Sequence, residues 1–363
     1  MDVTRFDKIK RVLIYRLGSL GDTVVALPSF HLIARAFPAA ERRALTNIPV
    51  ASAANPISAI IGNSGLIHGY MAYPIKLRNP AKLFKLSLQI RRWQPEVLVY
   101  LTEPRGKARA VRDALFFKLC GIKHLVGVPN TRALQENRWI NEEQGFEHEG
   151  ARLARCLRIL GEVDLDDPRN WDLVLTPEEE RRAQEVLEGW PGRDRFIACS
   201  VGTKLNLNNW GEKNWAELLK RFSMQYTGYG LLLIGVAEES ALSERLSRHW
   251  SGPKLNLCGR LSPRESAAVL RQATMFVGHD SGPIHLAACV NVPSVGIFGA
   301  RNKPGVWFPY GTKHRIIYHQ TECSGCKLEL CLEHKHKCIT TITVDEVIEA
   351  MEQTLRGRNI DVS

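Results

Sequence analysis

The sequence predicts an α/β protein made of two Rossmann-like halves, each with a mostly parallel sheet and helices on both faces. Short apolar segments typical of strands alternate with longer amphipathic segments typical of helices, which is the order of βα repeats. The alternation stops once, in a stretch rich in charge, proline and glycine, and then begins again. With 363 residues, of which 44% are hydrophobic, the chain is long enough for two domains of ordinary size.

The N-terminal half begins this alternation at residue 11. Strands are predicted for the segments RVLIY (11–15), EVLVYL (96–101) and HLVGV (124–128). Helices are predicted over residues 22–37, 81–93 and 107–120, and Gly121 ends the last of them. In the helix over 81–93 the apolar side chains recur at helical spacing, and most lysines and arginines lie off that face.

The break in the alternation covers residues 161–194, where charge, proline and glycine increase. This composition is typical of a linker followed by a connecting helix, so we place the domain boundary near Leu175. The predicted domains are residues 1–175 and 176–342. A helix and tail over 343–363 follow, and we leave open that they pack back on the N-terminal domain.

The C-terminal half repeats the pattern with strands FIACSVG, GLLLIG, MFVGHD and SVGIFG. Helices are predicted over 214–223, 240–250, 262–273, 283–290 and 343–355. Asn214 is the expected N-cap of the first, and Ser262 with Glu265 forms a capping box around Pro263 in the third. Thr343 and Glu346 form another capping box.

The net charge of +11 is concentrated in residues 76–112, which contain ten lysines and arginines against two glutamates. This segment is either a solvated face or a surface for an anionic partner, such as phospholipid, lipopolysaccharide, nucleic acid or sugar phosphate. Nucleic acid is disfavoured because no common nucleic-acid-binding signature is present. We find no signal peptide and no apolar segment of membrane-spanning length, so we expect a cytoplasmic protein with at most peripheral contact with the inner membrane.

Nine cysteines divide into two groups. Five are scattered among apolar residues and are expected to be small core residues: Cys120, Cys156, Cys199, Cys258 and Cys289. The other four follow the pattern C-x2-C-x4-C-x6-C, with two interleaved histidines: Cys323, Cys326, Cys331, Cys338, His334 and His336. This spacing fits either a structural zinc site or a reduced cysteine-rich loop.

The segment RLGSLGDTVVALP (16–28) has the order strand, glycine turn and helix. A helix N-terminus after such a turn attracts anions, because its N–H groups are unpaired and the helix dipole is positive there. Gly18, Ser19 and Gly21 form this turn, yet Asp22 lies where the anion would bind. From its position alone, Asp22 is expected to be a helix-capping acid.

A second loop, FVGHDSGPIHLAA (276–288), has the character of a phosphate site. The strand is expected to end at Gly278, and residues 279–282 to form a turn before Pro283. The Ser281 hydroxyl, the Gly282 N–H and the helix dipole suit a phosphate. Asp280 either caps the helix or contacts a sugar hydroxyl, and His285 either packs or points back toward the loop.

The loop SVGTKLNLNNWGEKNW (200–215) follows another strand. Gly202 and Thr203 allow a ligand to approach the backbone closely. Lys204 and Lys213 either bind phosphate or are ordinary exposed lysines. Trp210 is expected to pack in the core.

The segments RLGSLGDTVVALP, VGTKLNLNNWGEKNW and GHDSGPIHLAACVNVPSVGIFG, with the closing CSGCKLELC and ITVDEVIEAM, resemble glycosyltransferase family 9, the lipopolysaccharide heptosyltransferases and their relatives. The resemblance runs in order along almost the whole chain. It implies a GT-B fold, in which the two domains face each other across a cleft. It also implies an N-terminal domain for the acceptor, a C-terminal domain for the nucleotide-sugar, and inverting transfer without a catalytic metal.

The resemblance further implies roles for individual residues. Asp22 corresponds to the general base of the family, and the loop with Ser281 and Gly282 to the site of the donor diphosphate. The family often has a lysine where this chain has Asn208, so Lys204 or Lys213 is expected to substitute. Further donor contacts are expected from Gly202, Thr203, Glu239, Arg260, Leu261, Asp280 and His285. Acceptor contacts are expected from Gly18, Ser19, Gly21, Arg105, Lys107 and Arg109.

We therefore expect a heptosyltransferase-like enzyme that needs no cofactor. Its expected partners are a nucleotide-sugar, with an ADP-sugar as first choice, and an anionic glycolipid or core oligosaccharide. A sugar-nucleotide epimerase with the GT-B fold and a non-catalytic sugar-nucleotide-binding protein stay open as alternatives. An NAD-dependent dehydrogenase is disfavoured because neither half has G-x-G-x-x-G after a strand.

Overall fold

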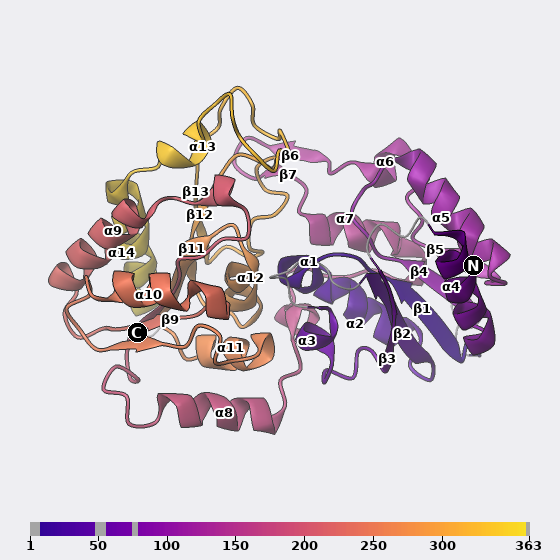
Figure 1. The fold of residues 1–363 in the computed structure, drawn as a ribbon, viewed down its shortest axis with the longest axis horizontal. Coiled ribbons are helices and arrows are strands. Elements are labelled where there is room, and N and C mark those ends of the chain that lie inside the picture. Colours follow the sequence, from indigo (N-terminus) through magenta and orange to yellow (C-terminus); the bar gives the residue numbers. More distant parts are fainter. Residues whose placement is uncertain (1–7, 48–55, 75–78, 361–363) are drawn as a thin grey trace. The chain divides into compact units, whose positions relative to one another are not determined.

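The computed structural model describes residues 8–47, 56–74 and 79–360 (Figure 1). The chain divides into two compact units, Met1–Val174 and Leu175–Ser363. Each unit contains one parallel sheet with helices packed against it, which confirms the predicted α/β class. In the described ranges, no helix is both long enough and apolar enough to cross a membrane.

The first unit contains a five-stranded parallel sheet with the order β3-β2-β1-β4-β5. The order reverses between β1 and β4, so the loops that follow these two strands leave the same edge on either side of the reversal. The strands are β1 Arg11–Tyr15, β2 Glu41–Asn47, β3 Gly69–Tyr73, β4 Val97–Tyr100 and β5 His124–Val126, and a two-stranded antiparallel ribbon contains β6 Trp139–Asn141 and β7 Gly145–Phe146.

Helices of the first unit cover this sheet. Leu86 and Ile90 of α4 and Phe117 of α5 pack with strand residues such as Leu13 and Leu98 in one buried cluster, so α4 and α5 cover the same face. The helices are α1 Leu20–Val25, α2 Leu27–Ala36, α3 Ser58–Ile61, α4 Pro80–Trp93, α5 Lys107–Leu119, α6 Arg132–Gln135 and α7 Glu149–Cys156, with 3-10 turns at Arg158–Leu160 and Pro168–Trp171.

The prediction of a single helix over residues 22–37 is wrong, because the structure has two helices there. Ala26 has φ −90° and ψ 0°, and it separates α1 from α2. Pro28 lies in the first turn of α2, and because proline has no N–H it cannot continue a helix that began upstream. The break separates the short helix α1, which contains Asp22, from the longer helix α2.

The second unit contains a six-stranded parallel sheet with the order β10-β9-β8-β11-β12-β13. This order reverses between β8 and β11, as the first sheet reverses between β1 and β4. The strands are β8 Phe196–Ser200, β9 Gly230–Leu233, β10 Lys254–Asn256, β11 Met275–His279, β12 Ser294–Phe298 and β13 Arg315–Tyr318. The helices are α8 Pro177–Leu187, α9 Glu212–Gln225, α10 Ser240–Ser247, α11 Pro263–Leu270, α12 Gly282–Cys289, α13 Lys337–Thr340 and α14 Val344–Ile360, with 3-10 turns at Asn206–Asn208 and Ala237–Glu239.

The structure corrects one prediction about the helices of this unit. The helix expected to start at Asn214 begins at Glu212, with Gly211 as N-cap, and the Asn214 amide instead donates to the Trp210 carbonyl. The C-terminal helix, which we left open to pack on the N-terminal domain, packs on α9, β12 and β13. Its side chains Val347, Met351 and Leu355 are buried in the core of the second unit.

Candidate active site

The turn between β1 and α1 holds Asp22 in a fixed position. The backbone N–H of Ser19 and its hydroxyl both donate to Asp22 Oδ2, at 2.5 and 2.8 Å. Gly18 has φ +122°, and a Cβ at this position would lie 2.5 Å from the Asp22 Cβ and Cγ atoms. Only glycine therefore fits beside the carboxylate.

Arg16 directly follows β1 and connects this turn to the loop after β4. Its side chain is buried, and its guanidinium donates to the backbone carbonyls of Leu101 and Asp22. Because both partners are carbonyls, the positive charge stays available to the carboxylates nearby.

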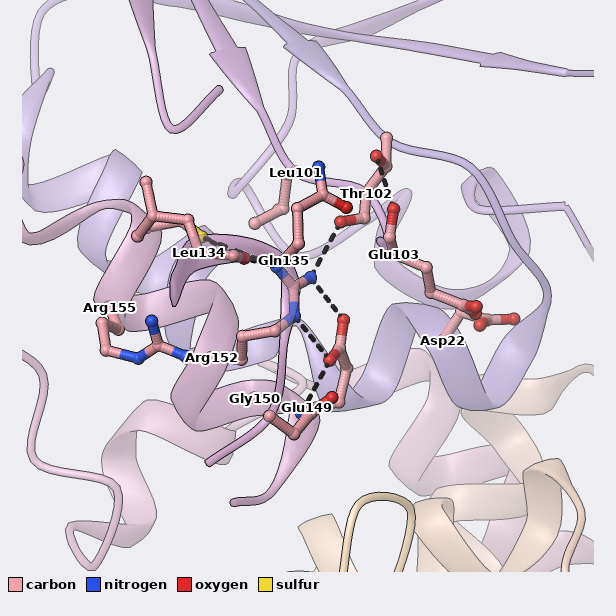
Figure 2. Close-up of polar contacts among 12 residues, drawn as sticks. Asp22, Leu101, Thr102, Glu103, Leu134, Gln135, Glu149, Gly150, Arg152 and Arg155 are labelled. Atoms are coloured by element: carbon pink, nitrogen blue, oxygen red, sulfur yellow. Dashed lines mark hydrogen bonds and ion pairs between the residues drawn. The ribbon is translucent and has the colours of Figure 1, made fainter. Parts of the chain in front are cut away.

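Glu103 is a functional candidate that the sequence analysis missed. It lies in the loop after β4, and its carboxyl group is within hydrogen-bond reach of the Asp22 carboxyl group (Figure 2). In the sequence it counted only as a charge in the basic segment. The signal that would have identified it is the strand order, because the loops after β1 and β4 meet where the order reverses.

The two carboxyl groups have opposite pKa shifts. Burial acts to raise the pKa of Asp22, but the hydrogen bond with Glu103, the charge of Arg16 and the bonds from Ser19 outweigh it and lower the pKa. Glu103 reaches solvent, yet the protein atoms around its carboxyl group and the neighbouring Asp22 raise its pKa. The opposite shifts favour an ionised Asp22 beside a Glu103 that keeps its proton to higher pH than an ordinary glutamate does.

A buried ion pair supports the loop that contains Glu103 (Figure 2). Arg152 and Glu149 of α7 are 0% and 1% exposed and form two charge-assisted hydrogen bonds, at 2.6 and 2.8 Å. The guanidinium also donates to the carbonyls of Thr102 and Leu134, both at 2.9 Å. Arg152 thus connects α7 to the residue directly before Glu103.

The three predicted acceptor-binding cations differ in their surroundings. Arg105 forms an ion pair with Asp113 and donates to the hydroxyls of Tyr15 and Tyr100, at 3.2 and 3.0 Å. Its charge is therefore neutralised inside the unit. Lys107 and Arg109, in the first turn of α5, are exposed.

In the second unit, His279 joins the two predicted donor loops. It is the last residue of β11 and is fully buried, whereas we expected it in the turn. Its Nε2 accepts hydrogen bonds from the Trp210 backbone N–H, at 3.1 Å, and from the Trp215 indole, at 3.2 Å. The proton is therefore on Nδ1, which donates to the Gly202 carbonyl at 3.3 Å. Burial lowers the pKa of His279 to about 4, so the ring is neutral.

Glu239 lies directly over two glycines. A Cβ on Gly202 would be 1.8 Å from Glu239 Oε1, and one on Gly235 would be 2.1 Å from Oε2. Oε2 accepts a hydrogen bond from the Val236 N–H at 3.1 Å, and burial raises the pKa of the carboxyl group. The structure thus brings the predicted residues Gly202 and Glu239 into contact.

The other predicted donor residues lie in the loops and first helical turns that follow strands β8, β10 and β11. Ser281 is the N-cap of α12, with Gly282 as the first helical residue, and His285 is buried in the same helix. The exposed residues are Lys204, Lys213 and Arg260, while Thr203 and Leu261 are half-buried. Asn208, which replaces the lysine frequent in the family, is 4% exposed, and its Oδ1 has no hydrogen-bond partner.

The cysteine cluster follows β13, and a cavity lies at the end of the same strand. The N–H of Cys326 donates to the carbonyl of Cys323, which closes a turn. In the described part of the chain, no three His, Cys, Asp or Glu side chains are arranged to hold a metal ion. A cavity of about 710 Å³ is lined by Tyr318, His319, Gln320, Thr321, Glu322, Lys337 and Thr341, none of which is a predicted site residue.

Comparison with known proteins gives both sequence relatives and similar structures. The sequence model of glycosyltransferase family 9 (heptosyltransferase) matches residues 108–337. Lipopolysaccharide heptosyltransferase 3 of Escherichia coli K12 is 23% identical over 48% of this chain and 51% of its own length. Lipopolysaccharide heptosyltransferase 1 of Pseudomonas aeruginosa is 32% identical over 41% of this chain and 40% of its own. The chain thus matches about half the length of these curated relatives or less.

Solved structures match over nearly the whole chain. The glycosyl transferase family 9 protein from Veillonella parvula has a TM-score of 0.72 at 17% identity, covering 96% of this chain and 98% of that one. E. coli ADP-heptose lipopolysaccharide heptosyltransferase II has a TM-score of 0.65 at 16% identity, covering 96% and 99%. E. coli heptosyltransferase WaaC with ADP-2-deoxy-2-fluoro heptose has a TM-score of 0.63 at 18% identity, covering 94% and 99%. These likenesses concern the fold. Together with the family match, they show that this chain belongs to glycosyltransferase family 9, the heptosyltransferase family, and has its GT-B fold.

Proposed function

We propose that this protein is an inverting glycosyltransferase that moves heptose or a related sugar from a nucleoside-diphosphate donor to a lipopolysaccharide-core or related glycan acceptor. The observation that carries the proposal is the position of the Asp22 carboxylate, which Gly18 and Ser19 fix after β1. Family membership supports the class of reaction, and the WaaC complex with an ADP-sugar analogue supports an ADP-sugar as donor.

In this reaction Asp22 acts as the general base. It accepts the proton of an acceptor hydroxyl while the hydroxyl oxygen attacks the anomeric carbon of the donor sugar. The bond from that carbon to the diphosphate oxygen breaks, and the nucleoside diphosphate leaves with the electron pair. Attack from the face opposite the leaving group inverts the anomeric configuration.

Glu103 sets the charge of the base. With one proton on Glu103, the pair has a single negative charge, which repels an anionic acceptor less than two charges do. The proton bound by Glu103 also donates to Asp22 and helps to hold it in place. The exposed Lys107 and Arg109 follow in the chain and are proposed to bind acceptor phosphates.

The second unit is proposed to bind the donor. The Ser281 hydroxyl and the Gly282 N–H at the start of α12 suit the diphosphate, whose charge increases as it leaves. Lys204 and Lys213 are exposed cations that can replace the lysine absent at Asn208. Glu239 is proposed to bind the ribose, because its carboxylate lies against Gly202 and Gly235, in the loops that follow β8 and β9.

The first test is thermal stability with ADP, GDP, UDP and CDP. A ligand of the folded state increases the free energy of unfolding by mass action, by about 2.7 kcal/mol at a concentration of a hundred times Kd, and so raises the melting temperature. We expect ADP to give the largest shift and Ser281→Trp to remove it. Thr227→Trp, at an exposed loop position of the same unit, is the matched control and should retain the shift. No shift with any nucleotide would contradict the donor site.

The second test separates the base from the donor site. Asp22→Asn keeps the shape of the side chain but removes the charge that accepts the proton. We expect transfer to an acceptor to fall by at least about 100-fold, with the ADP-dependent thermal shift unchanged. Undiminished transfer by Asp22→Asn would refute the base assignment, and sugar-nucleotide turnover without acceptor would favour an epimerase instead.

A further inference from the structure

The outer face of helices α4 and α5 combines features that the sugar-transfer site does not use. The two helices lie side by side, because the Arg91 guanidinium at the end of α4 donates to the Leu119 carbonyl at the end of α5, at 2.6 Å (Figure 1). Their inner faces cover the sheet through Leu86, Ile90 and Phe117. Their outer faces are open to solvent.

The outer face of α5 has an apolar stripe. Val111, Leu115 and Leu119 are spaced four residues apart, so they follow one another along one side of the helix. Their side chains are 49%, 60% and 65% exposed, and Phe84 on α4 is 64% exposed. Buried Ala110 and Phe117 show that the core-facing side of α5 is a separate one. The outer stripe therefore does not serve the core.

The same two helices are strongly basic. They contain eight lysines and arginines and a single acidic residue, Asp113. Asp113 is buried and is paired with Arg105, outside these helices, and with Arg112, so it offsets at most one of the exposed charges. The basic residues are Lys82, Lys85, Arg91, Arg92, Lys107, Arg109, Arg112 and Lys118. Lys76 and Arg78, which belong to the basic segment of the sequence, lie outside the described residues.

We propose that this outer face docks on an anionic lipid bilayer. A solvated face explains the charges but not the row of exposed leucines and valine. A nucleic acid also explains the charges, but its phosphate backbone offers nothing apolar for that row to contact. A bilayer surface offers both, because anionic headgroups lie directly above the acyl chains. The proposal concerns this surface alone and does not depend on the sugar-transfer reaction.

Docking here would place the bilayer beside the candidate active site of the first unit. Helix α5 begins four residues after Glu103. Glu103 and Arg105 lie in the loop directly before this helix. A lipid-linked molecule in the same bilayer would therefore be held near this loop. The expected partner is a headgroup surface with phosphate charges, and not one particular lipid.

The experiment is vesicle flotation of the full chain with phosphatidylcholine alone and with phosphatidylcholine mixed with phosphatidylglycerol. We expect binding to the mixed vesicles only, and release by salt, because exposed charges are screened within a Debye length. Equal binding to both vesicles, or to neither, would overturn the proposal.

Matched variants locate the surface. Lys82→Gln with Lys85→Gln should weaken binding by at least about tenfold, since each cation near an anionic surface contributes roughly fivefold. Leu115→Gln with Leu119→Gln should also weaken binding, at unchanged charge. Met224→Gln is the control, because Met224 on α9 is 67% exposed and lies in the second unit.

All these positions are exposed, so unchanged melting temperatures will verify that the variants fold. Loss of binding in Met224→Gln as large as in the leucine variant would overturn the assignment to α4 and α5. Full binding by the leucine variant would likewise overturn it, since charge alone would then account for the attraction. A DNA duplex that competes with vesicles and depends on the same leucines would point to nucleic acid instead.

Discussion

Asp22 and Glu103 titrate as one unit, because their carboxyl groups lie within hydrogen-bond reach of each other beside the buried Arg16. Neither residue alone explains the charge of the site at neutral pH. Asp22 has its base-like ionised state because Ser19, Arg16 and the Glu103 proton stabilise the carboxylate. Glu103 in turn keeps its proton because a second negative charge there would face the first.

The raised pKa of Glu103 predicts a pH-dependent stability. Between the usual glutamate pKa of about 4.3 and the raised value of about 8, the folded protein holds a proton that the unfolded chain has released. The free energy of unfolding therefore decreases as pH rises through this window. Glu103→Gln removes the ionisation, so its free energy of unfolding should decrease less over the same range. Urea denaturation at a series of pH values measures both curves.

Glu136→Gln, at an exposed glutamate of the same unit, controls for the loss of any surface carboxylate. If Glu103→Gln and wild type give parallel curves from acid to alkaline pH, the shared proton does not exist. If Glu103→Gln alone differs from wild type, and the difference in the free energy of unfolding grows with pH, the carboxyl pair accounts for that difference.

Single residues also show how far the sequence could lead. Asp22 was identifiable because it follows a glycine turn at the end of an apolar strand, a local pattern. Glu103 was not, because its partner is 81 positions away in the chain and only the strand order brings them together. His279 was misplaced for a similar reason, since its burial depends on Trp210 and Trp215 from another loop.

At the scale of elements, α7 supports the candidate active site through the buried pair of Glu149 and Arg152. Arg152→Met would leave the Glu149 carboxylate buried without its partner, and would leave the carbonyls of Thr102 and Leu134 without their donor. We expect a loss of about 3–5 kcal/mol in the free energy of unfolding, measured by urea denaturation.

The control is Arg132→Met, which removes an exposed pair with Glu136 four residues away and should cost at most about 0.5 kcal/mol. The double variant Glu149→Leu with Arg152→Met should recover part of the loss, because no unpaired charge remains. A loss in Arg152→Met as small as in the control would show that the pair does not stabilise α7.

The sequence predicted the elements with strong local signals and missed those without them. The capping boxes at Ser262 and Thr343 form as predicted, because both rest on residues three positions apart. Strand β2 begins with Glu41 and two arginines, and the edge strands β10 and β13 are short, so none shows a clear apolar run. Arg42 is tolerated in β2 because its guanidinium donates to carbonyls of neighbouring turns.

At the scale of the whole molecule, both units repeat one plan, in which a parallel sheet reverses its strand order beside the candidate loops. The sequence could predict the two parallel-sheet halves, because βα alternation and its single interruption are visible along the chain, but it did not predict the order of the strands. Each unit also has its own buried core. A ligand that binds one unit is therefore expected to stabilise that unit more than the other.

Hydrogen exchange should show this division. If ADP binds as proposed, amide protection should increase in the second unit, around the loops that follow β8 and β11. The first unit should change little, since its candidate site is assigned to the acceptor. Ser281→Trp should abolish the gain. A gain centred on the turn after β1 would instead assign the nucleotide to the first unit.

The contact of Glu239 with Gly202 and Gly235 has a consequence for how this protein can vary. Its carboxylate fills the space where two Cβ atoms would be, so the three positions are coupled sterically. Alanine at either glycine would displace the carboxylate, although neither glycine has a reactive group. In a saturation mutagenesis screen, substitutions at either glycine would therefore reduce function as strongly as substitutions at a catalytic residue. Tolerance would return only in backgrounds where position 239 has become smaller, a dependence that single substitutions cannot show.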